Sequence, residues 1–180
     1  MENVPKGAKT VMARLREHGF EAYLVGGCVR DCLLGKTPND WDITTNALPG
    51  QSQAVFADFH VVEMGLKHGT LTVVVDKLPY EVTTYRVDGT YLDNRHPENV
   101  SFTQSLAEDL SRRDFTVNAM AVSYPDGELT DLFGGMEDIS RRMIKCVGEP
   151  AKRFTEDALR ILRAFRFAAK LGFEIEADTY

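Results

Sequence analysis

The sequence predicts an α/β fold in which a mixed β-sheet is flanked by helices. Short runs rich in β-branched residues with alternating polarity, such as residues 70–76 and 80–86, indicate strands. Stretches with apolar residues three and four positions apart, such as residues 6–17, indicate amphipathic helices. Turns that contain glycine or proline separate these runs along the chain.

The first half of the chain begins with a helix that we expect to be scaffold. Its apolar residues Ala8, Val11, Met12 and Leu15 form one stripe, and a His-Gly pair ends it. The elements that follow are predicted as strands at 20–25, 41–45, 59–63, 70–76 and 80–86 and helices at 28–34 and 48–56, with a hairpin turn at 77–79.

The second half begins with a polar stretch, residues 86–102, that has no clear period. A stretch of this length inside a compact domain is more often a functional loop than filler, and disorder without a role is the alternative. The later elements are predicted as a helix at 106–110, a hairpin of 119–124 and 128–132, a helix at 136–142, a strand at 143–147, a helix from the N-cap Thr155 to 171, and the lead-in to another helix at 174–180.

The composition is that of an ordinary soluble chain of 180 residues, 43% hydrophobic and 27% charged. No stretch approaches the roughly 18 consecutive apolar residues of a membrane span, and the polar N-terminus does not resemble a secretory signal, so we expect no membrane partner and a cytoplasmic location. The net charge of −6 argues against a domain that simply coats nucleic acid. An RNA substrate would therefore need local basic patches or residues beyond Tyr180.

Three cysteines give an odd count, and none has the spacing of a zinc site. Cys28 and Cys32 lie four residues apart on a predicted helix, which favours two small buried thiols over a disulfide.

A pair of carboxylates stands out in residues 39–45, which read Asn-Asp-Trp-Asp-Ile-Thr-Thr. Side chains alternate along a strand, so Asp40 and Asp42 share one face while Trp41 and Ile43 can enter a core. Two carboxylates in a small space favour a cation between them. Mg²⁺ commonly takes one or two carboxylates plus substrate phosphates, so the pair indicates a metal clamp for nucleotide chemistry. Aspartates in a turn or a helix cap are the alternative.

The segment before this pair reads as a short buried strand ending at Val25, a break at Gly26 and Gly27, and a helix that stops at Gly35. A strand, two glycines and a helix start place unpaired backbone N–H groups and a positive dipole end beside the carboxylates. We therefore expect a phosphate site next to the metal site.

These motifs resemble a known family. One segment is similar to the first motif of the bacterial CCA-adding tRNA nucleotidyltransferase and poly(A) polymerase family, which belongs to the polymerase-β-like nucleotidyltransferases. This segment reads Gly26-Gly27-x-x-Arg30-Asp31-x-x-Leu34-Gly35 and is followed by Asp40-x-Asp42. The resemblance continues through Glu81-Val-Thr-Thr-Tyr-Arg86, Arg112-Arg113-Asp114-Phe115-Thr116-Val117-Asn118-Ala119-Met120, Asp131-Leu-Phe-Gly134-Gly135 and Glu156-Asp157-x-x-Arg160. It covers essentially the whole chain in the family's order.

The resemblance implies a nucleotidyltransferase head over residues 1–148 and the start of a truncated helical neck over 149–180. It implies an enzyme that adds C and A to the 3′ end of tRNA from CTP and ATP. A poly(A) polymerase, an enzyme adding only CC or only A, and a nucleotide-binding remnant without turnover are the alternatives. For residues 86–102 it implies a flexible loop linked to adding the terminal adenosine. Nothing in the sequence predicts an oligomeric state.

The resemblance also implies the catalytic residues. Asp40 and Asp42 would hold Mg²⁺, with Glu81 as a third carboxylate on a neighbouring strand. A solvated acid on a strand is the alternative for Glu81. Gly26, Gly27 and Arg30 would cradle phosphates.

Two further groups are implied as nucleotide-binding. Arg113, Asp114 and Asn118 would lie near the ribose and the triphosphate, where a simple exposed ion-pair cluster is the alternative. Asp157 and Arg160 would present acceptors and donors to the base edge, where a local ion pair on one helix face is the alternative.

Overall fold

The computed structural model describes residues 4–89 and 100–180. Its helices are α1 (Lys6–Glu17), α2 (Gly27–Leu33), α3 (Pro49–Val55), α4 (Leu106–Ser111), α5 (Gly135–Arg141), α6 (Pro150–Glu156) and α7 (Leu159–Leu171), with the 3-10 turns η1 (Leu66–His68) and η2 (Thr116–Asn118). Its strands are β1 (Ala22–Val25), β2 (Asp42–Thr45), β3 (His60–Val62), β4 (Thr70–Val75), β5 (Leu78–Thr84), β6 (Arg86–Asp88), β7 (Val100–Phe102), β8 (Met120–Ser123), β9 (Leu129–Asp131), β10 (Met143–Ile144) and β11 (Glu174–Ile175).

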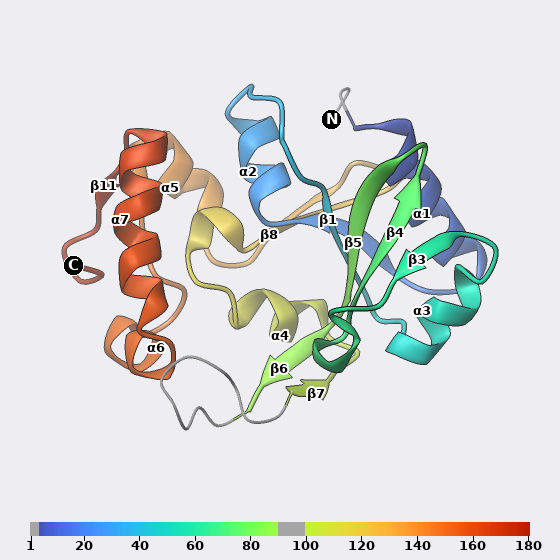
Figure 1. Ribbon diagram of the computed structural model, residues 1–180. Helices are drawn as coiled ribbons and strands as arrows, with labels where there is room; N and C mark the ends of the chain where they lie inside the picture. Colours follow the sequence, from blue (N-terminus) through green and yellow to red (C-terminus); the bar gives the residue numbers. More distant parts are fainter. Residues whose placement is uncertain (1–3, 90–99) are drawn as a thin grey trace.

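A mixed sheet forms the centre of the described residues, in the order β3-β4-β5-β2-β1-β8-β9. The pairing of β2 with β5 is parallel, and the other neighbours in this sheet run antiparallel. Helices flank the sheet, with α1 and α3 at one end of the molecule and α7 at the other (Figure 1). The predicted fold class is confirmed.

The two faces of the sheet are covered by different helices because side chains alternate along each strand. Leu24 of β1 lies on the face that α1 covers, and the whole apolar stripe of α1 is fully buried there. Val25 faces the other way and packs against Leu110 of α4 and Ala121 of β8. The scaffold helix predicted at 6–17 is therefore confirmed, and it buries the face behind the carboxylate strand.

The turn between β4 and β5 differs from the predicted one. We expected residues 77–79 to form the turn, but β5 already begins at Leu78. The two connecting residues, Asp76 and Lys77, have φ angles of 52° and 66°. Two positive φ angles in succession are typical of a two-residue hairpin whose twist matches that of its strands.

The polar stretch 86–102 is not loop throughout. Its ends form β6 and β7, which pair antiparallel with Arg86 opposite Phe102. Its middle, residues 90–99, lies outside the described residues.

The predicted single helix from Thr155 to 171 is wrong at its start. The structure has α6, which begins at Pro150, and α7, which begins at Leu159. Proline suits the first turn of a helix, where its missing N–H has no partner to lose. Asp157 breaks the run because its Oδ1 accepts a hydrogen bond from the Leu159 backbone N–H at 3.0 Å.

The end of the chain also differs from the expectation. Residues 174–180 were predicted to lead into a helix, whereas Glu174 and Ile175 form β11, which pairs in parallel with β10. An apolar cluster accompanies this pairing and joins Phe115, Val117 and Ile144 to Phe167 and Phe173. Residues on both sides of position 148 thus share one core.

All three cysteines are free, with Cys28 and Cys146 buried and Cys32 half-buried. Burial raises the pKa of Cys28 to about 12, so this thiol is inert at neutral pH. Within residues 4–89 and 100–180, no helix is both long and apolar enough to span a bilayer.

Candidate active site

The carboxylate strand places its acids next to a second strand. β2 pairs in parallel with β5, and Asp42 lies directly opposite Glu81 in the register. Opposed residues of neighbouring strands point to the same face, roughly 5 Å apart at the backbone. Asp40 precedes β2 in a bend and is exposed, while Trp41 between the two aspartates is buried. The burial of Trp41 and Ile43 agrees with their predicted core positions, whereas β2 begins only at Asp42, so a face shared by Asp40 and Asp42 stays a prediction.

Electrostatics supports a common environment for these acids. The pKa of Asp42 is raised to about 6, chiefly by burial and then by the charge of Glu81, with the Arg113 guanidinium acting to lower it and Asp40 to raise it. A half-buried carboxylate that is repelled by two neighbouring carboxylates is stabilised by a cation placed among them. The residues present thus fit a divalent metal with oxygen ligands. Among the residues that the structure describes, no three His, Cys, Asp or Glu side chains form a metal-binding group by themselves.

The diglycine bend lies against the same acids. Gly26 has φ 78° and ψ −131°, a backbone conformation that favours glycine. A Cβ atom at this position would lie 3.2 Å from Arg113 Nη1 and 3.9 Å from Asp42 Oδ2. The bend therefore brings backbone close to both a guanidinium and a carboxylate.

Asp42, the diglycine bend and Arg113 border one cleft with a volume of about 230 Å³, whose lining does not include Asp40 or Glu81. Most of the predicted site residues meet there, from β2, α2 and the segment around η2, together with two residues of α7. The lining residues are Gly26, Gly27, Arg30, Asp42, Arg113, Asp114, Asn118, Arg163 and Phe167.

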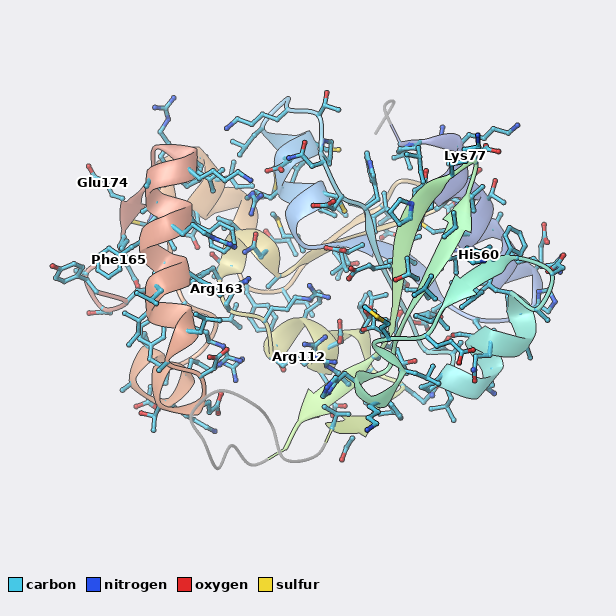
Figure 2. All side chains as sticks on the ribbon, in the orientation of Figure 1. His60, Lys77, Arg112, Arg163, Phe165 and Glu174 are labelled. Atoms are coloured by element: carbon cyan, nitrogen blue, oxygen red, sulfur yellow. The ribbon has the colours of Figure 1, made fainter. Side chains whose placement is uncertain are left out.

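One wall of the cleft is a continuous hydrogen-bonded chain. Arg30 is almost fully buried, and its Nη1 donates to Asn118 Oδ1 at 2.6 Å. Asn118 Nδ2 donates to Asp114 Oδ1 at 3.2 Å, and Asp114 Oδ2 accepts from Arg163 Nε at 2.7 Å. The chain of contacts connects α2 to α7, and Figure 2 shows Arg163 on the side of α7 that faces the rest of the molecule, opposite Phe165.

The side chain of Arg113 is held by a buried carboxylate. Its Nη2 donates to Asp109 Oδ2 at 3.2 Å, and Asp109 has no exposed surface. The Nε of Arg113 is buried and has no hydrogen-bond partner among the described residues. A buried unpaired donor beside a cleft is typical of a site that a ligand or water completes.

Asp157 and Arg160 do not line this cleft. Their side chains approach each other to 4.0 Å. Arg160 is nearly buried, where its Nη1 contacts Glu156 Oε2 at 3.1 Å and the Arg153 carbonyl at 3.0 Å. Their proposed role toward the base stays a prediction. The proposed role of Glu81 as a third carboxylate beside the metal also stays a prediction.

The structure adds residues that the sequence reasoning missed. Arg163 and Phe167 line the cleft, and Asp109 supports Arg113. A usable signal was present, because Arg160, Arg163 and Phe167 recur at helical spacing on one face of α7. No comparable signal marks Asp109, whose partners come from sequence-distant strands as well as from the residues that directly follow its own helix.

The chain matches known proteins over most of its length. Residues 22–145 match the family described as "Poly A polymerase head domain". The chain is 52% identical over 172 residues to a CCA-adding enzyme of Leuconostoc mesenteroides, an alignment that covers 96% of this chain and 42% of that relative. The chain thus spans less than half the length of the curated relatives that it matches.

Solved structures agree with this match. The Bacillus stearothermophilus CCA-adding enzyme in complex with CTP superposes with a TM-score of 0.87 at 48% identity, covering 96% of this chain and 40% of that one. A tRNA nucleotidyltransferase complexed with a primer tRNA and an incoming ATP analog superposes with a TM-score of 0.73 at 36% identity, covering 94% of this chain and 47% of that one.

Proposed function

The chain belongs to the poly(A) polymerase head domain family, and from this membership we propose that it is the head of an RNA nucleotidyltransferase that adds C and A to the 3′ end of tRNA. The relatives named CCA-adding enzyme, at 52% identity, support this choice within the family. Complexes of similar proteins with CTP and with primer tRNA support CTP, ATP and tRNA as substrates. A tRNA-processing role suits a cytoplasmic location.

Nucleotidyltransferases of this family generally use a divalent metal, and we assign Mg²⁺ to this one. Asp40 and Asp42 would hold it, with Glu81 beside them in the register. Oxygen ligands and a nucleotide substrate suit Mg²⁺, which commonly binds through one or two carboxylates plus phosphate oxygens. When bound, the metal would supply charge neutralisation for the triphosphate and would acidify the attacking hydroxyl.

The protein's own groups would bind and orient the nucleotide. Gly26 and Gly27 allow the triphosphate to approach the backbone, and Arg30 and Arg113 offer guanidinium donors to its oxygens. Asp114 and Asn118 carry acceptors and donors suited to the ribose hydroxyls. Asp157 and Arg160 would pair with the base edge, which requires Arg160 to exchange its contacts with Glu156 and the Arg153 carbonyl for contacts with the base.

In the reaction, the terminal 3′ hydroxyl of the RNA would lose its proton to water, and its oxygen would form a bond to the α-phosphorus. The bond between that phosphorus and the bridging oxygen to the β-phosphate breaks, and pyrophosphate leaves with the electron pair. The arginines stabilise the charge that develops on the leaving group. The observation that carries the proposal is the meeting of Asp42 with Gly26, Arg30 and Arg113 at a single cleft.

The test is nucleotide addition to tRNA that lacks its 3′ CCA, with CTP alone, ATP alone and both together. Two C residues followed by one A support the proposal. A tract of A, addition of C only, or addition of A only would instead identify one of the other polymerases. Binding of Mg·CTP without any product would identify a nucleotide-binding remnant.

The matched variants are Asp42→Asn and Asp126→Asn. The second removes an exposed carboxylate from the turn between β8 and β9. We expect Asp42→Asn to lower the rate about a thousandfold or more, equivalent to about 4 kcal/mol of transition-state stabilisation. Asp126→Asn should leave the rate unchanged. An active and correctly folded Asp42→Asn protein would refute the metal assignment.

A further inference from the structure

The sheet offers a second surface on the side of the acids that lies away from the cleft. Glu81 is exposed, yet it does not line the cleft that Asp42 shares with Gly26 and Arg113. Asp42 therefore has the cleft on one side and Glu81, on the neighbouring strand β5, on the other. A carboxylate beside the candidate metal site thus faces a surface outside the nucleotide cleft.

This surface continues past Glu81 as a row of residues on one face of the sheet. Glu81 lies directly opposite Thr72 of β4, and Thr72 lies directly opposite Val62 of β3. Opposed residues point to the same face, so these three side chains extend the line that begins at Asp42. Neighbouring strands are about 4.8 Å apart, which places Thr72 roughly 10 Å from Asp42 at the backbone.

The row is open to solvent because helices cover the other face of these strands. Leu71 and Val73, which alternate with Thr72, are buried in the same apolar core as residues of α1 and α3. Val62, by contrast, is 38% exposed, and Thr72 is half-buried.

The hydroxyl of Thr72 is available to a ligand. It has no hydrogen bond with any residue in the ranges 4–89 and 100–180. Two positions earlier on the same face, Thr70 Oγ1 lies 2.9 Å from Thr83 Oγ1, so that hydroxyl already has a partner. The open row therefore contains one half-buried hydroxyl without an internal partner.

The chemistry of nucleotide transfer favours an approach from this side. The attacking oxygen and the leaving pyrophosphate lie roughly in line through the α-phosphorus. If Gly26 and Arg113 hold the triphosphate in the cleft, the attacking hydroxyl reaches the α-phosphate from the far side of Asp42. Glu81 and Thr72 lie on that far side.

We propose that the open row, with the adjacent Val74, binds the 3′-terminal nucleotide of the RNA acceptor. The inference rests on the proposed function, which supplies an RNA 3′ end as the nucleophile. The Thr72 hydroxyl can donate to or accept from a ribose hydroxyl of that nucleotide. Val74 shares the face of Thr72 because it lies two positions along the same strand, and it is half-buried.

The two valines give the terminal base an apolar surface without selecting its identity. Neither Val62 nor Val74 has a side-chain group that can hydrogen-bond a base edge. The surface therefore accepts any terminal base. An acceptor whose last nucleotide changes with every addition requires this tolerance.

Photo-cross-linking locates the acceptor end without requiring turnover. The probe is a tRNA that lacks its CCA end and carries 4-thiouridine as its 3′-terminal nucleotide, irradiated with the 180-residue chain. We expect mass spectrometry to find the modified residue in β3 or β4. The same tRNA with 4-thiouridine in its anticodon loop is the control and should leave both strands unmodified. A terminal cross-link confined to other elements would overturn the proposal.

The matched variants are Thr72→Val and Thr70→Val, because valine removes the hydroxyl and keeps the β-branched shape that suits a strand. We expect Thr72→Val to raise the KM for tRNA about three- to tenfold, the usual effect of one hydrogen bond. Its affinity for Mg·CTP, measured by calorimetry without RNA, should stay unchanged. Thr70→Val should leave the KM for tRNA unchanged, since that hydroxyl is bonded within the protein. Equal rises in the two variants would overturn the proposal.

The acceptor surface and the proposed function fail separately. A wild-type protein that adds no nucleotide, but whose terminal cross-link lies in β4, would refute the proposed function and support this inference. Addition of C and A together with a terminal cross-link outside β3 and β4 would do the reverse.

Discussion

Asp109 is the most enclosed charge near the cleft. It has no exposed surface, and its Oδ1 accepts from Arg112 Nη2 at 2.8 Å and from the Arg86 backbone N–H at 3.3 Å. Its Oδ2 accepts from Arg113 and from Thr44 of β2, both at 3.2 Å. A single side chain therefore supports a cleft arginine, the carboxylate strand and the base of the β6–β7 pair.

We predict that Asp109→Asn lowers the free energy of unfolding by about 3–5 kcal/mol, because two guanidiniums would lose the carboxylate that neutralises them in the interior. Urea titration measures this loss. Asp58→Asn is the control, since Asp58 pairs with Arg14 at the surface, where such a contact contributes at most about 1 kcal/mol. Equal losses in the two variants would show that Asp109 contributes no more than a surface pair.

The pH dependence of stability follows from the same carboxylate. Burial acts to raise the pKa of Asp109, but the Arg112 and Arg113 guanidiniums outweigh it and leave this pKa below its ordinary value. A lowered folded-state pKa gives stability that is present above the unfolded value of about 3.9 and is lost as the pH falls through the folded value. Asp109→Asn should therefore flatten the decline of unfolding free energy below about pH 4. An unchanged acid limb would contradict this.

At the scale of elements, the contact between α5 and η2 fixes the segment that carries Asn118. Gly135 begins α5, and a Cβ there would lie 2.4 Å from the Thr116 carbonyl oxygen and 2.9 Å from Met120. A distance below 3.0 Å to a backbone atom cannot be relieved by turning a side chain. The close approach of the two elements therefore depends on glycine.

We predict that Gly135→Ala destabilises the fold by about 1–3 kcal/mol, the usual cost of overpacking, and weakens nucleotide binding by displacing η2. Thermal unfolding and Mg·CTP titration measure the two effects. Gly50→Ala is the matched control, because Gly50 lies in the first turn of α3 with no atom within 4 Å of the added Cβ. Alanine there should be neutral or stabilising by up to about 1 kcal/mol. A Gly135→Ala protein as stable as wild type would contradict the prediction.

The elements differ in how much the sequence reveals of them. The helix at 6–17 is periodic and buried on one stripe, so its bounds follow from the pattern alone. The break at Asp157 does not, because helical periodicity continues through it and one side-chain cap decides the boundary. The turn at Asp76 and Lys77 was missed for a similar reason, since neither residue is the glycine or asparagine that favours positive φ.

The candidate site likewise combines parts that the sequence predicts with parts that it does not. The bend at Gly26 and the acids around Asp42 are close in sequence, so their neighbourhood could be predicted. Helical spacing marks Arg163 and Phe167 as one face of α7, but the sequence does not reveal that Arg163 meets Asp114, because the two residues lie 49 positions apart and their contact depends on how the C-terminal residues pack. Motif order identifies which residues matter, and tertiary packing decides which of them meet.

At the scale of the whole molecule, the division at position 148 crosses a shared core. Phe115, Val117 and Ile144 pack with Phe167 and Phe173 from beyond it. Arg163 also pairs with Asp114 across it at 2.6 Å. Contacts across this position couple the stability of the residues on its two sides, and the boundary itself stays a prediction.

We predict that a chain ending at residue 148 is markedly less stable than the 180-residue chain and binds Mg·CTP weakly, because its apolar cluster and its cleft would each lose one side. Calorimetric unfolding of both chains measures the difference. A cooperative transition at the same temperature in the shorter chain would support the predicted boundary instead.

Because Asp42 lies directly opposite Glu81, the candidate site is sensitive to the length of the β4–β5 hairpin as well as to which residues are present. An insertion of one residue between Leu78 and Glu81 would shift β5 by one step, turning the acid toward the hydrophobic interior and the Tyr80 phenol toward the nucleotide. An insertion of two residues would restore the original facing. Odd changes in the length of this hairpin should therefore turn the acid away from the face that carries Asp42, whereas a two-residue insertion should keep its face but move it along β2 to a position opposite Thr44.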